Sequence, residues 1–274
     1  LALPLLVGIL VAAKNIPKFL HEAKKVKKNI LAGNTTVKIT CAFFAILFFI
    51  GFIVALAPPS TNQPGPTDQD SLNYHLVIPK FYLSQHSLEH IPFLAYDNWP
   101  HSIETFYTIP MSLGGISAVK LTMLFVSLAL LLALFSFARR FVKTDHALLA
   151  PLIFASSPIV FLALGSAYID IALTFFVVLA MMCLHSWTLD KKWQNMLLVG
   201  VFAGFAASVK LSGAIPLFLI ALLLTFLSLK EKNKLQIIGE WKYFGLPALV
   251  FALPWLIRTA MNNAALNPIF PLYS

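Results

Sequence analysis

The sequence predicts an all-α fold: a polytopic bundle of transmembrane helices with a long extracytoplasmic loop that bears amphipathic surface helices. Hydrophobic residues make up 59% of the chain and charged residues only 11%, with a mean hydropathy of +0.81. A soluble domain averages about 25% charged residues, so this composition indicates an integral membrane protein. Apolar runs of membrane-spanning length recur along the chain, and basic residues gather in alternate connections between them.

The first element is LALPLLVGILVAA (1–13), which we interpret as the end of a truncated span, because a signal peptide would have a charged segment before it. Each later run approaches the roughly 20 apolar residues that cross about 30 Å of hydrocarbon, and the shorter ones can span a locally thinned bilayer. A small-residue stripe in one of them, at Gly200, Gly204 and Ser208, is typical of a close helix contact. The later runs are 39–57, 121–138, 147–164, 171–189, 196–209, 214–229 and 243–257.

The basic residues predict how these spans are oriented. Sixteen of the 20 Lys and Arg residues lie in every second connection. Because positively charged loops stay in the cytoplasm, we expect these connections to face inward. The net charge of +9 therefore reports orientation, and nucleic acid is not an expected partner. The basic connections are 14–38, 139–143, 191–192 and 230–242.

Two parts are expected along the chain. Residues 1–38 would form the truncated first span and a Lys-rich cytoplasmic loop. Residues 39–274 would form a transmembrane domain that is incomplete at its C-terminus, with an extracytoplasmic loop at 58–116. The sequence contains no inverted halves of the kind that mark secondary transporters.

The 58–116 loop concentrates the polar chemistry. It leaves the membrane as APPSTNQPGPTDQD, which cannot be helical through its prolines. The following SLNYHLVIPKFYLSQHSLEH suits a surface helix interrupted near Pro79, and WPHSIETFYTIPMSLGG is similar. Six of the eleven acidic residues and four of the seven histidines face outward on this topology. This asymmetry indicates that the chemistry of the protein lies on the outer side.

Two aspartates, Asp68 and Asp70, stand two residues apart shortly after the first complete span. One interpretation is a helix cap, because an aspartate accepts hydrogen bonds from unpaired backbone N–H groups at a helix start. The other is a general base or metal ligand at the water–lipid boundary, where partial desolvation raises the pKa of a carboxyl group. Both interpretations stay open at this point.

Lys210 and Arg258 each lie at the predicted outer end of an apolar run. A single cation there can simply extend its charge to the interface. Two cations at the level of the aspartates favour an anionic ligand such as a lipid phosphate, which Arg binds as a fork and Lys as a point charge. Asp170, in the short turn GSAYID, could bind Lys210, cap the next span or join this site.

These groups suit the transfer of a sugar from a polyprenyl phosphate. The departing phosphate is the anion of a strong acid and needs no proton. One base for the acceptor hydroxyl and positive charge for the phosphate are therefore sufficient. A single outward-facing aspartate with Lys210 and Arg258 would supply both.

Five stretches together resemble the GT-C superfamily of polytopic glycosyltransferases, with the closest likeness to bacterial relatives of protein O-mannosyltransferases and aminoarabinose transferases. The resemblance covers residues 40–274 and implies a hexosyltransferase type of enzyme that uses a polyprenyl-phosphate-linked sugar. It also implies a multi-pass protein of the bacterial cytoplasmic membrane with its active site facing outward, and leaves the acceptor (lipid, glycan or protein) open. The stretches are DSLNYHLVIPKFYL, WPHSIETFY, GSAYIDIALTFFVVLA, GVFAGFAASVKLSG and IRTAMNNAALNPIFP.

The resemblance also implies which residue is the base. In the family this is an aspartate early in the first large outer loop, and Asp70 is the matching position, with Asp68 as the second catalytic candidate. Many members have Asp-Glu there, whereas Ser71 follows Asp70 in this chain. The second acidic role is therefore open to Asp68 or Asp170.

Further roles follow from the same resemblance. Lys210 matches a family lysine after a small-residue helix, and Arg258 matches an arginine before the Asn-Pro segment; both would bind the donor phosphate. Some members need a divalent cation and others do not, which leaves this cofactor open. Its outer ligands would come from Asp68, Asp70, Asp170 and His75. Other site candidates are Tyr74, His75, Lys80, His101, Glu104, Tyr168 and Asp170.

Two other classes of function are weighed against an enzyme. A transporter or flippase of lipid-linked saccharides would place charged residues near the bilayer midplane, in repeated halves, whereas the charges here lie at the outer ends of the runs. A non-catalytic scaffold of an envelope complex would use the outer loop only to bind partners.

Overall fold

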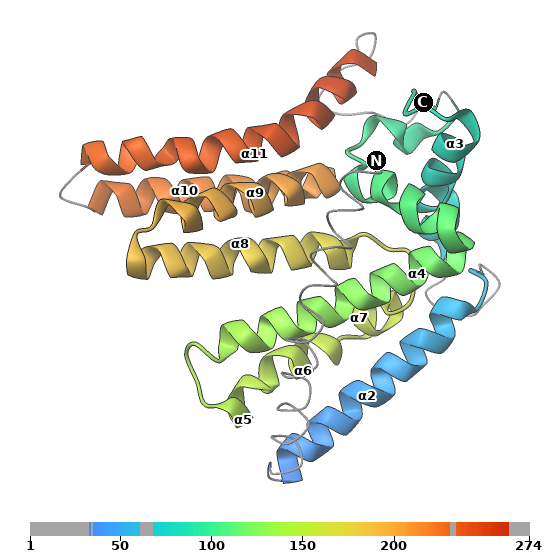
Figure 1. The fold of residues 1–274 in the computed structure, drawn as a ribbon, viewed down its shortest axis with the longest axis horizontal. Helices are drawn as coiled ribbons and strands as arrows, with labels where there is room; N and C mark the ends of the chain where they lie inside the picture. Colours follow the sequence, from blue (N-terminus) through green and yellow to red (C-terminus); the bar gives the residue numbers. More distant parts are fainter. Residues whose placement is uncertain (1–32, 34, 61–67, 92, 231–233, 263–274) are drawn as a thin grey trace.

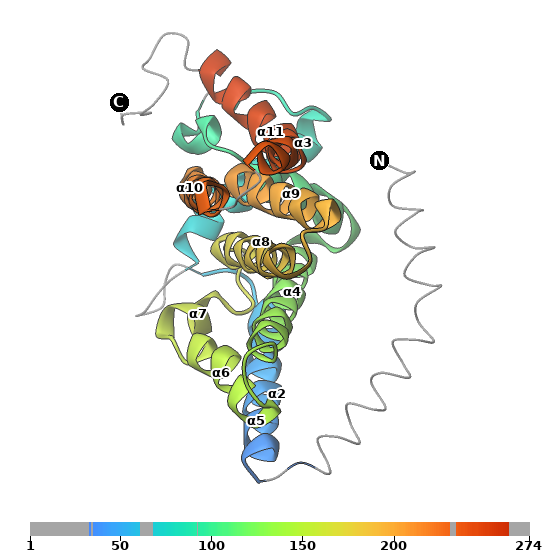
Figure 2. The same cartoon turned by 90° about the vertical axis from the view of Figure 1, so that its left-hand side faces the viewer.

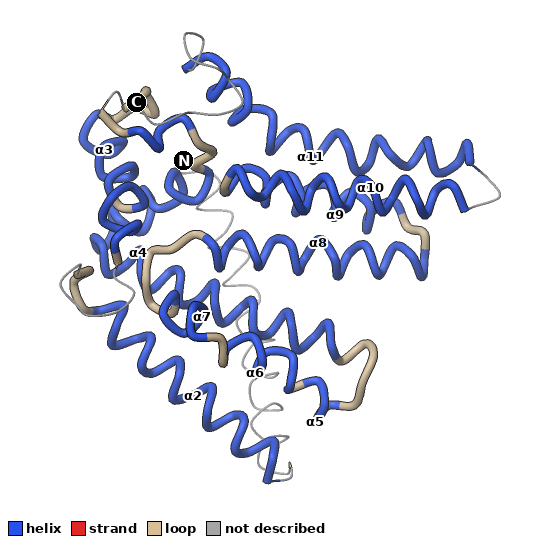
Figure 3. The backbone as a smooth tube through the Cα atoms, turned by 180° about the vertical axis from the view of Figure 1, so that it is seen from behind, coloured by secondary structure: helices blue, strands red, loops and turns tan. Residues whose placement is uncertain are grey.

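The computed structural model describes residues 33, 35–60, 68–91, 93–230 and 234–262. Every regular element within these ranges is helical (Figure 3). The predicted all-α fold is therefore confirmed. The expected truncated span at 1–13 and the closing Asn-Pro segment lie outside the described residues.

The helices follow the apolar runs of the sequence. Four helical segments of the described part are long and apolar enough to cross a membrane: Thr35–Leu56, Ser102–Ala138, Asp170–Asp190 and Trp241–Met261. The described elements are α2 (Thr35–Leu56), the π-helix η1 (Ser71–His75), α3 (Val77–Gln85), the 3-10 helix η2 (Ala95–Asn98), α4 (Ser102–Ala138), α5 (Thr144–Ala147), α6 (Leu149–Ala155), α7 (Pro158–Ala163), α8 (Asp170–Asp190), α9 (Trp193–Val209), the 3-10 helix η3 (Leu211–Gly213), α10 (Ala214–Lys230) and α11 (Lys234–Asn262).

The outer surfaces of these helices are apolar. On α2, Ile46 is 59% exposed and Phe49 is 63% exposed, and Phe218 of α10 is 66% exposed. Contiguous apolar surface of this kind is rare on soluble monomers. With the four apolar spans, it identifies an integral membrane protein, as the composition predicts.

Helix α4 is longer than the run at 121–138, because it also contains the stretch that was expected to lie on the membrane surface. The two parts meet at Gly114 and Gly115, which leave the helical conformation. Gly115 has a φ of 65°, a backbone conformation that glycine adopts without a steric penalty. The helical conformation is interrupted at this kink, so α4 consists of two helical segments that differ in direction.

The run at 147–164, which the sequence predicts as one span, is not a continuous helix. It contains the last residue of α5 and the short helices α6 and α7. The break between α6 and α7 lies at Ser157, whose backbone is extended before Pro158. Proline disfavours a helical residue before it but is tolerated at the first helical position, so Pro158 ends one helix and begins the next.

The surface helix after Asp70 is divided, but not at Pro79. The π-helix η1 closes with a bond from the Leu76 N–H to the Ser71 carbonyl oxygen, 2.9 Å long, and α3 begins at Val77. Pro79 lies in the first turn of α3, where a missing N–H leaves no helical bond unmade. The junction of the two helix types therefore separates the segments, and the proline does not.

The helices form a row in which neighbours pack side by side. Helix α9 lies between α8 and α11, α4 packs on α8, and α2 packs on α4 (Figures 1 and 2). The end of α2, the starts of α4 and α8, and the ends of α9 and α11 all lie at the same end of the bundle, on the right in Figure 1. Successive crossings of a membrane give this alternation.

Glycine brings two of these helices into close contact. A Cβ on Gly200 would lie 2.2 Å from the Phe244 carbonyl oxygen, and one on Gly204 would lie 2.6 Å from that of Ala248. Both glycines belong to α9 and both carbonyls to α11. The predicted contact of the small-residue stripe is therefore confirmed, with α11 as its partner.

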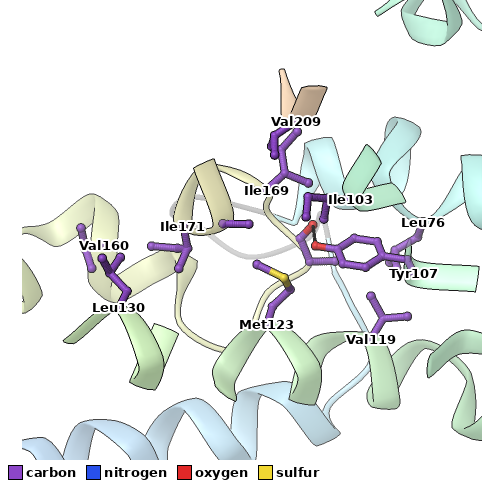
Figure 4. Close-up of a cluster of buried hydrophobic side chains, with 12 residues drawn as sticks. Leu76, Ile103, Tyr107, Val119, Met123, Leu130, Val160, Ile169, Ile171 and Val209 are labelled. Atoms are coloured by element: carbon purple, nitrogen blue, oxygen red, sulfur yellow. Dashed lines mark hydrogen bonds between the residues drawn. The ribbon is translucent and has the colours of Figure 1, made fainter. Parts of the chain in front are cut away.

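A buried core fixes the ends of α8 and α9 (Figure 4). Ile169 and Ile171 flank Asp170 in the sequence and Val209 precedes Lys210, and all three apolar side chains are at most 4% exposed. They pack with side chains of α4 in one cluster. The same cluster holds Tyr107 of α4, whose hydroxyl donates to the Ala167 carbonyl oxygen at 3.1 Å. The core therefore determines where the two charged residues emerge.

Candidate active site

One cavity collects charged residues at this end of the bundle. Its volume is about 1120 Å³. Three carboxyl groups, two ammonium groups and a phenol line it together with apolar residues of α2, α6 and α7. The charged and phenolic residues are Asp68, Asp70, Lys120, Tyr168, Asp170 and Lys210. Segments that are far apart in the sequence thus contribute to one wall.

Asp70 directly precedes η1 and is partly exposed. Its carboxylate makes no capping hydrogen bond to that helix, so the capping interpretation does not apply to it. The Asp70 backbone N–H bonds the Tyr168 hydroxyl instead. Burial raises the pKa of Tyr168, and the carboxylate of Asp70 adds to the rise. The phenol therefore stays neutral, and the aspartate is held by its backbone while its carboxylate faces a cavity.

Asp170 and Lys210 form an ion pair across the cavity wall. Lys210 Nζ donates to Asp170 Oδ1 at 3.0 Å, which confirms one of the three roles considered for Asp170. The Asp170 side chain is 54% exposed, and the Lys210 side chain is 28% exposed. Such exposed pairs contribute at most about 1 kcal/mol to stability. The pair therefore places two charges at the cavity more than it stabilises the fold.

Lys120 is a cavity residue that the sequence analysis did not select. It is 1% exposed, and its Nζ donates to the Ala57 carbonyl oxygen just after α2 at 2.9 Å. The same nitrogen lies 3.9 Å from Asp68 Oδ2. The stretch ISAVKLTMLF carried a signal, because a charge inside an apolar helix is expensive and commonly functional.

His75, Glu104 and Tyr74 are not among the residues that line the cavity. His75 Nδ1 donates to Glu104 Oε1 at 2.7 Å, and both side chains are buried. Tyr74 stacks on Tyr96 with ring centroids 4.5 Å apart. Burial raises the pKa of Tyr74, which makes it an unsuitable base near neutral pH. These contacts hold η1 against α4 and η2, and Asp70 directly precedes η1.

Arg258 is not among the residues that line this cavity. Its guanidinium donates to Asp97 Oδ1 at 2.8 Å, to the Asp97 carbonyl oxygen at 2.6 Å and to the Tyr82 hydroxyl at 3.2 Å. The Asp97 carboxylate is fully buried and also accepts a bond from His90 Nδ1 at 2.6 Å. The arginine therefore clamps α11 to the segment around η2. The structure brings Lys210 to the aspartates but directs Arg258 to a different acid.

The two remaining candidates also lie away from the cavity wall. Lys80 is exposed on α3. His101 immediately precedes α4, and its Nε2 donates to the Tyr96 carbonyl oxygen at 2.8 Å. Burial lowers the pKa of His101, so the neutral imidazole is the favoured form.

Metal ligation was one interpretation of the aspartates. Within the described ranges, no group of three or more His, Cys, Asp or Glu residues is arranged to hold a metal ion. Two of the ligands considered, His75 and Asp170, are engaged with Glu104 and Lys210 respectively.

A family model described as dolichyl-phosphate-mannose-protein mannosyltransferase matches residues 101–257, more than half of the chain. The chain belongs to this family. The match begins just before α4 and ends within α11, and it includes the cavity residues Lys120, Asp170 and Lys210. No curated protein and no solved structure matches the chain.

Membership in the mannosyltransferase family makes the protein a membrane glycosyltransferase of the GT-C type and confirms the resemblance found in the sequence. The family uses polyprenyl-phosphate-linked sugar donors in a membrane setting. Asp68 and Asp70 precede the matched residues, and Arg258 directly follows them. The roles of these three residues therefore depend on the geometry of the site.

Proposed function

We propose that this protein transfers a hexose-type sugar from a polyprenyl-phosphate donor to a hydroxyl group of an extracytoplasmic lipid, glycan or protein. Asp70 acts as the general base, and Lys210 stabilises the departing phosphate. The observation that carries the proposal is that both residues line one cavity whose remaining wall is largely apolar.

The chemistry needs one proton acceptor and one cation. The acceptor oxygen attacks the anomeric carbon, its proton passes to the Asp70 carboxylate, and the bond from the sugar to the phosphate oxygen breaks. The electron pair leaves with the polyprenyl phosphate, which needs no proton from an acid. Lys210 meets the growing negative charge, and electrostatic stabilisation of this type is commonly a large part of catalysis. Its partner Asp170 is half-exposed, so the lysine can exchange one anion for another at low cost.

The apolar wall of the cavity suits the hydrocarbon chain of the donor. It is formed by side chains of α2, such as Ile50 and Val54, and of α7, such as Ile159 and Phe161. Ile159 is 77% exposed, as expected for a residue that meets lipid. A phosphate at the charged end would let its polyprenyl chain run along this wall within the membrane.

The topology in this proposal follows the basic residues. Residues 39–274 form the transmembrane domain, and the cavity opens to the outside of the cytoplasmic membrane of a bacterium. The connections that carry Arg139, Arg140, Lys191 and Lys192 lie at the end of the bundle opposite the cavity, on the left in Figure 1. The positive-inside tendency places that end in the cytoplasm.

A transporter or flippase of lipid-linked saccharides is the second candidate. It would need charged groups part-way along its spans. Two charged residues of the cavity lie instead at helix ends, because Asp170 is the first residue of α8 and Lys210 directly follows α9, while Lys120 lies within α4 shortly after the kink at Gly115. This placement favours chemistry at the membrane surface. A scaffold that only binds partners would not need charged residues around a cavity.

Replacement of the base tests the proposal. Full-length wild type and Asp70→Asn protein in lipid vesicles are given radiolabelled polyprenyl-phosphate mannose and a membrane extract as acceptor source. The amide cannot take the proton, so we expect transfer to fall at least about 100-fold, while protein level and thermal stability are unchanged. Asp145→Asn, the same change on an exposed residue of α5 at the other end of the bundle, is the control and should keep full activity.

Two results would contradict the proposal. Full transfer by the Asp70→Asn protein would remove Asp70 as the base. Movement of the labelled lipid across the bilayer by wild type, with no transfer to any component of the extract, would favour the transporter.

A further inference from the structure

Lys120 and Asp68 lie close together but do not form a direct hydrogen bond. Lys120 Nζ has three N–H donors, and the Ala57 carbonyl oxygen accepts one of them at 2.9 Å. Asp68 Oδ2 lies 3.9 Å away, which is beyond hydrogen-bonding distance. A buried ammonium is costly unless it is paired and hydrogen-bonded. The wall of the cavity therefore has a charged donor and a charged acceptor that face each other across a gap.

A single hydroxyl group can bridge these two atoms from one side. An oxygen placed about 2.8 Å from both atoms accepts from the ammonium and donates to the carboxylate, at normal hydrogen-bond lengths. Both neighbours of the ammonium, Ala57 and Asp68, line the cavity, as Lys120 itself does. The lysine is only 1% exposed, which leaves too little room beside it for a whole phosphate.

Charge supports an uncharged ligand at this position. Lys120 balances Asp68, and Lys210 balances Asp170, which leaves Asp70 as the unbalanced charge among the charged residues that line the cavity. A second anion beside Asp68 would add repulsion in a partly buried site. A sugar hydroxyl adds none.

We propose that Lys120 and Asp68 bind a hydroxyl of the sugar that the enzyme transfers and so select for that sugar. The inference rests on the proposed function and assigns a substrate contact to the same cavity. One hydrogen bond and the order of the chain place the pair beside the base. Ser71 Oγ donates to Asp68 Oδ1 at 3.4 Å, and Ser71 follows Asp70 in the chain.

The test separates the sugar from the lipid phosphate. Binding of polyprenyl-phosphate mannose and of sugar-free polyprenyl phosphate is measured by titration of the full-length protein in lipid nanodiscs. Lys120→Met removes the donor to the hydroxyl, so we expect the sugar-bearing lipid to bind about 10-fold more weakly, with no change for the sugar-free lipid. Lys210→Met should weaken both lipids. Lys143→Met, at an exposed lysine at the other end of the bundle, should change neither.

Asp68→Asn provides a second variant, because Lys120 also anchors the chain after α2 and its replacement could disturb folding. Asp68→Asn leaves the bond from Lys120 to the Ala57 carbonyl intact. We expect the same selective loss, and the double variant should lose less than the sum of the two single effects, as for residues that share one ligand group.

If the Lys120→Met and Asp68→Asn proteins bind the donor normally but have a raised KM for the acceptor, the hydroxyl site belongs to the acceptor, and the assignment to the donor sugar is overturned. Equal weakening of the sugar-bearing and sugar-free lipids, or no effect on either substrate, overturns the inference. Failure of wild type to bind or use the sugar-bearing lipid counts against the proposed function itself, which is a different result.

Discussion

Lys210 and Arg258 are alike in the sequence, because each is a cation beside the end of an apolar run, but their partners in the fold differ in burial. Lys210 faces Asp170, which is half-exposed, whereas Arg258 faces Asp97, which is fully buried. An exposed pair is worth at most about 1 kcal/mol and can be exchanged for a ligand. Removing one member of a buried pair leaves a charge without a partner and costs about 3 to 5 kcal/mol. Burial of the acid therefore decides which cation is available to substrate.

This difference predicts opposite effects of two matched replacements. Arg258→Met should destabilise the protein by about 3 kcal/mol, because the buried Asp97 carboxylate loses its guanidinium partner and keeps hydrogen bonds from His90 and from the Ile91 N–H. Lys210→Met should change stability by no more than about 1 kcal/mol but weaken the binding of polyprenyl phosphate. Thermal unfolding in detergent and lipid titration measure the two effects. A stable Arg258→Met protein that no longer binds the lipid would show that the arginine is a phosphate ligand after all.

The sequence predicts much of the site at the residue scale, but not its pairing. Lys210 and the outer aspartates are visible because polar residues beside apolar runs are few, and the Asp170–Lys210 pair was one of three alternatives. The Arg258–Asp97 pair joins residues 161 positions apart, which no local pattern reveals. Lys120 could have been found from its place inside an apolar helix, a signal that does not depend on distant contacts.

Helix α9 packs closely on α11 because two of its residues, Gly200 and Gly204, have no side chain. The two helices approach until carbonyl oxygens of α11 nearly fill the space that a Cβ would need on Gly200 and Gly204. Small residues allow such close packing between membrane helices, where no hydrophobic effect drives association. Because Lys210 directly follows α9, this contact also sets the depth of a cavity residue.

A pair of glycine replacements tests this contact. A Cβ at Gly200 would lie 2.2 Å from a carbonyl oxygen, whereas one at Gly245 of α11 would meet nothing within 4 Å. Gly200→Ala should therefore force the helices apart and destabilise the protein by about 1 to 3 kcal/mol. Gly245→Ala should be neutral or stabilising, since alanine favours a helix over glycine by up to about 1 kcal/mol. Thermal unfolding compares them, and equal stability of the two variants would contradict the close contact.

At the element scale, apolar length predicts where helices lie but not where they break. The runs at 39–57 and 171–189 match α2 and α8 within a few residues. Pro158 divides a run that composition alone treats as one span, and Pro79 leaves α3 whole because it falls in the first turn. The same residue type thus has opposite effects, which depend on its position relative to a helix start.

The two ends of the molecule carry different charged residues. The acids, Lys120 and Lys210 gather around a cavity at one end, and the connections after α4 and α8 carry basic residues at the other. The positive-inside tendency predicts from this asymmetry that the basic end faces the cytoplasm and the cavity faces outward.

Cysteine labelling checks that orientation. In a background with Cys41 and Cys183 replaced by alanine, Gln69→Cys places a thiol beside the cavity and Lys143→Cys places one at the opposite end. A membrane-impermeant maleimide added to intact cells should label position 69, and should label position 143 only after the membrane is permeabilised. Labelling in the reverse order would place the cavity in the cytoplasm and exclude an outward-facing transfer.

The wide turn at Ser71–His75 limits how this chain can vary in length. A π turn holds one residue more than an α turn, and such insertions commonly mark functional sites. Losing one residue there would convert it to an ordinary helix and rotate Asp70 by about 100° about the axis, because α3 beyond it is anchored by the buried Ile78 and Tyr82. Relatives that keep the reaction should therefore keep the length of this turn and not tolerate a deletion.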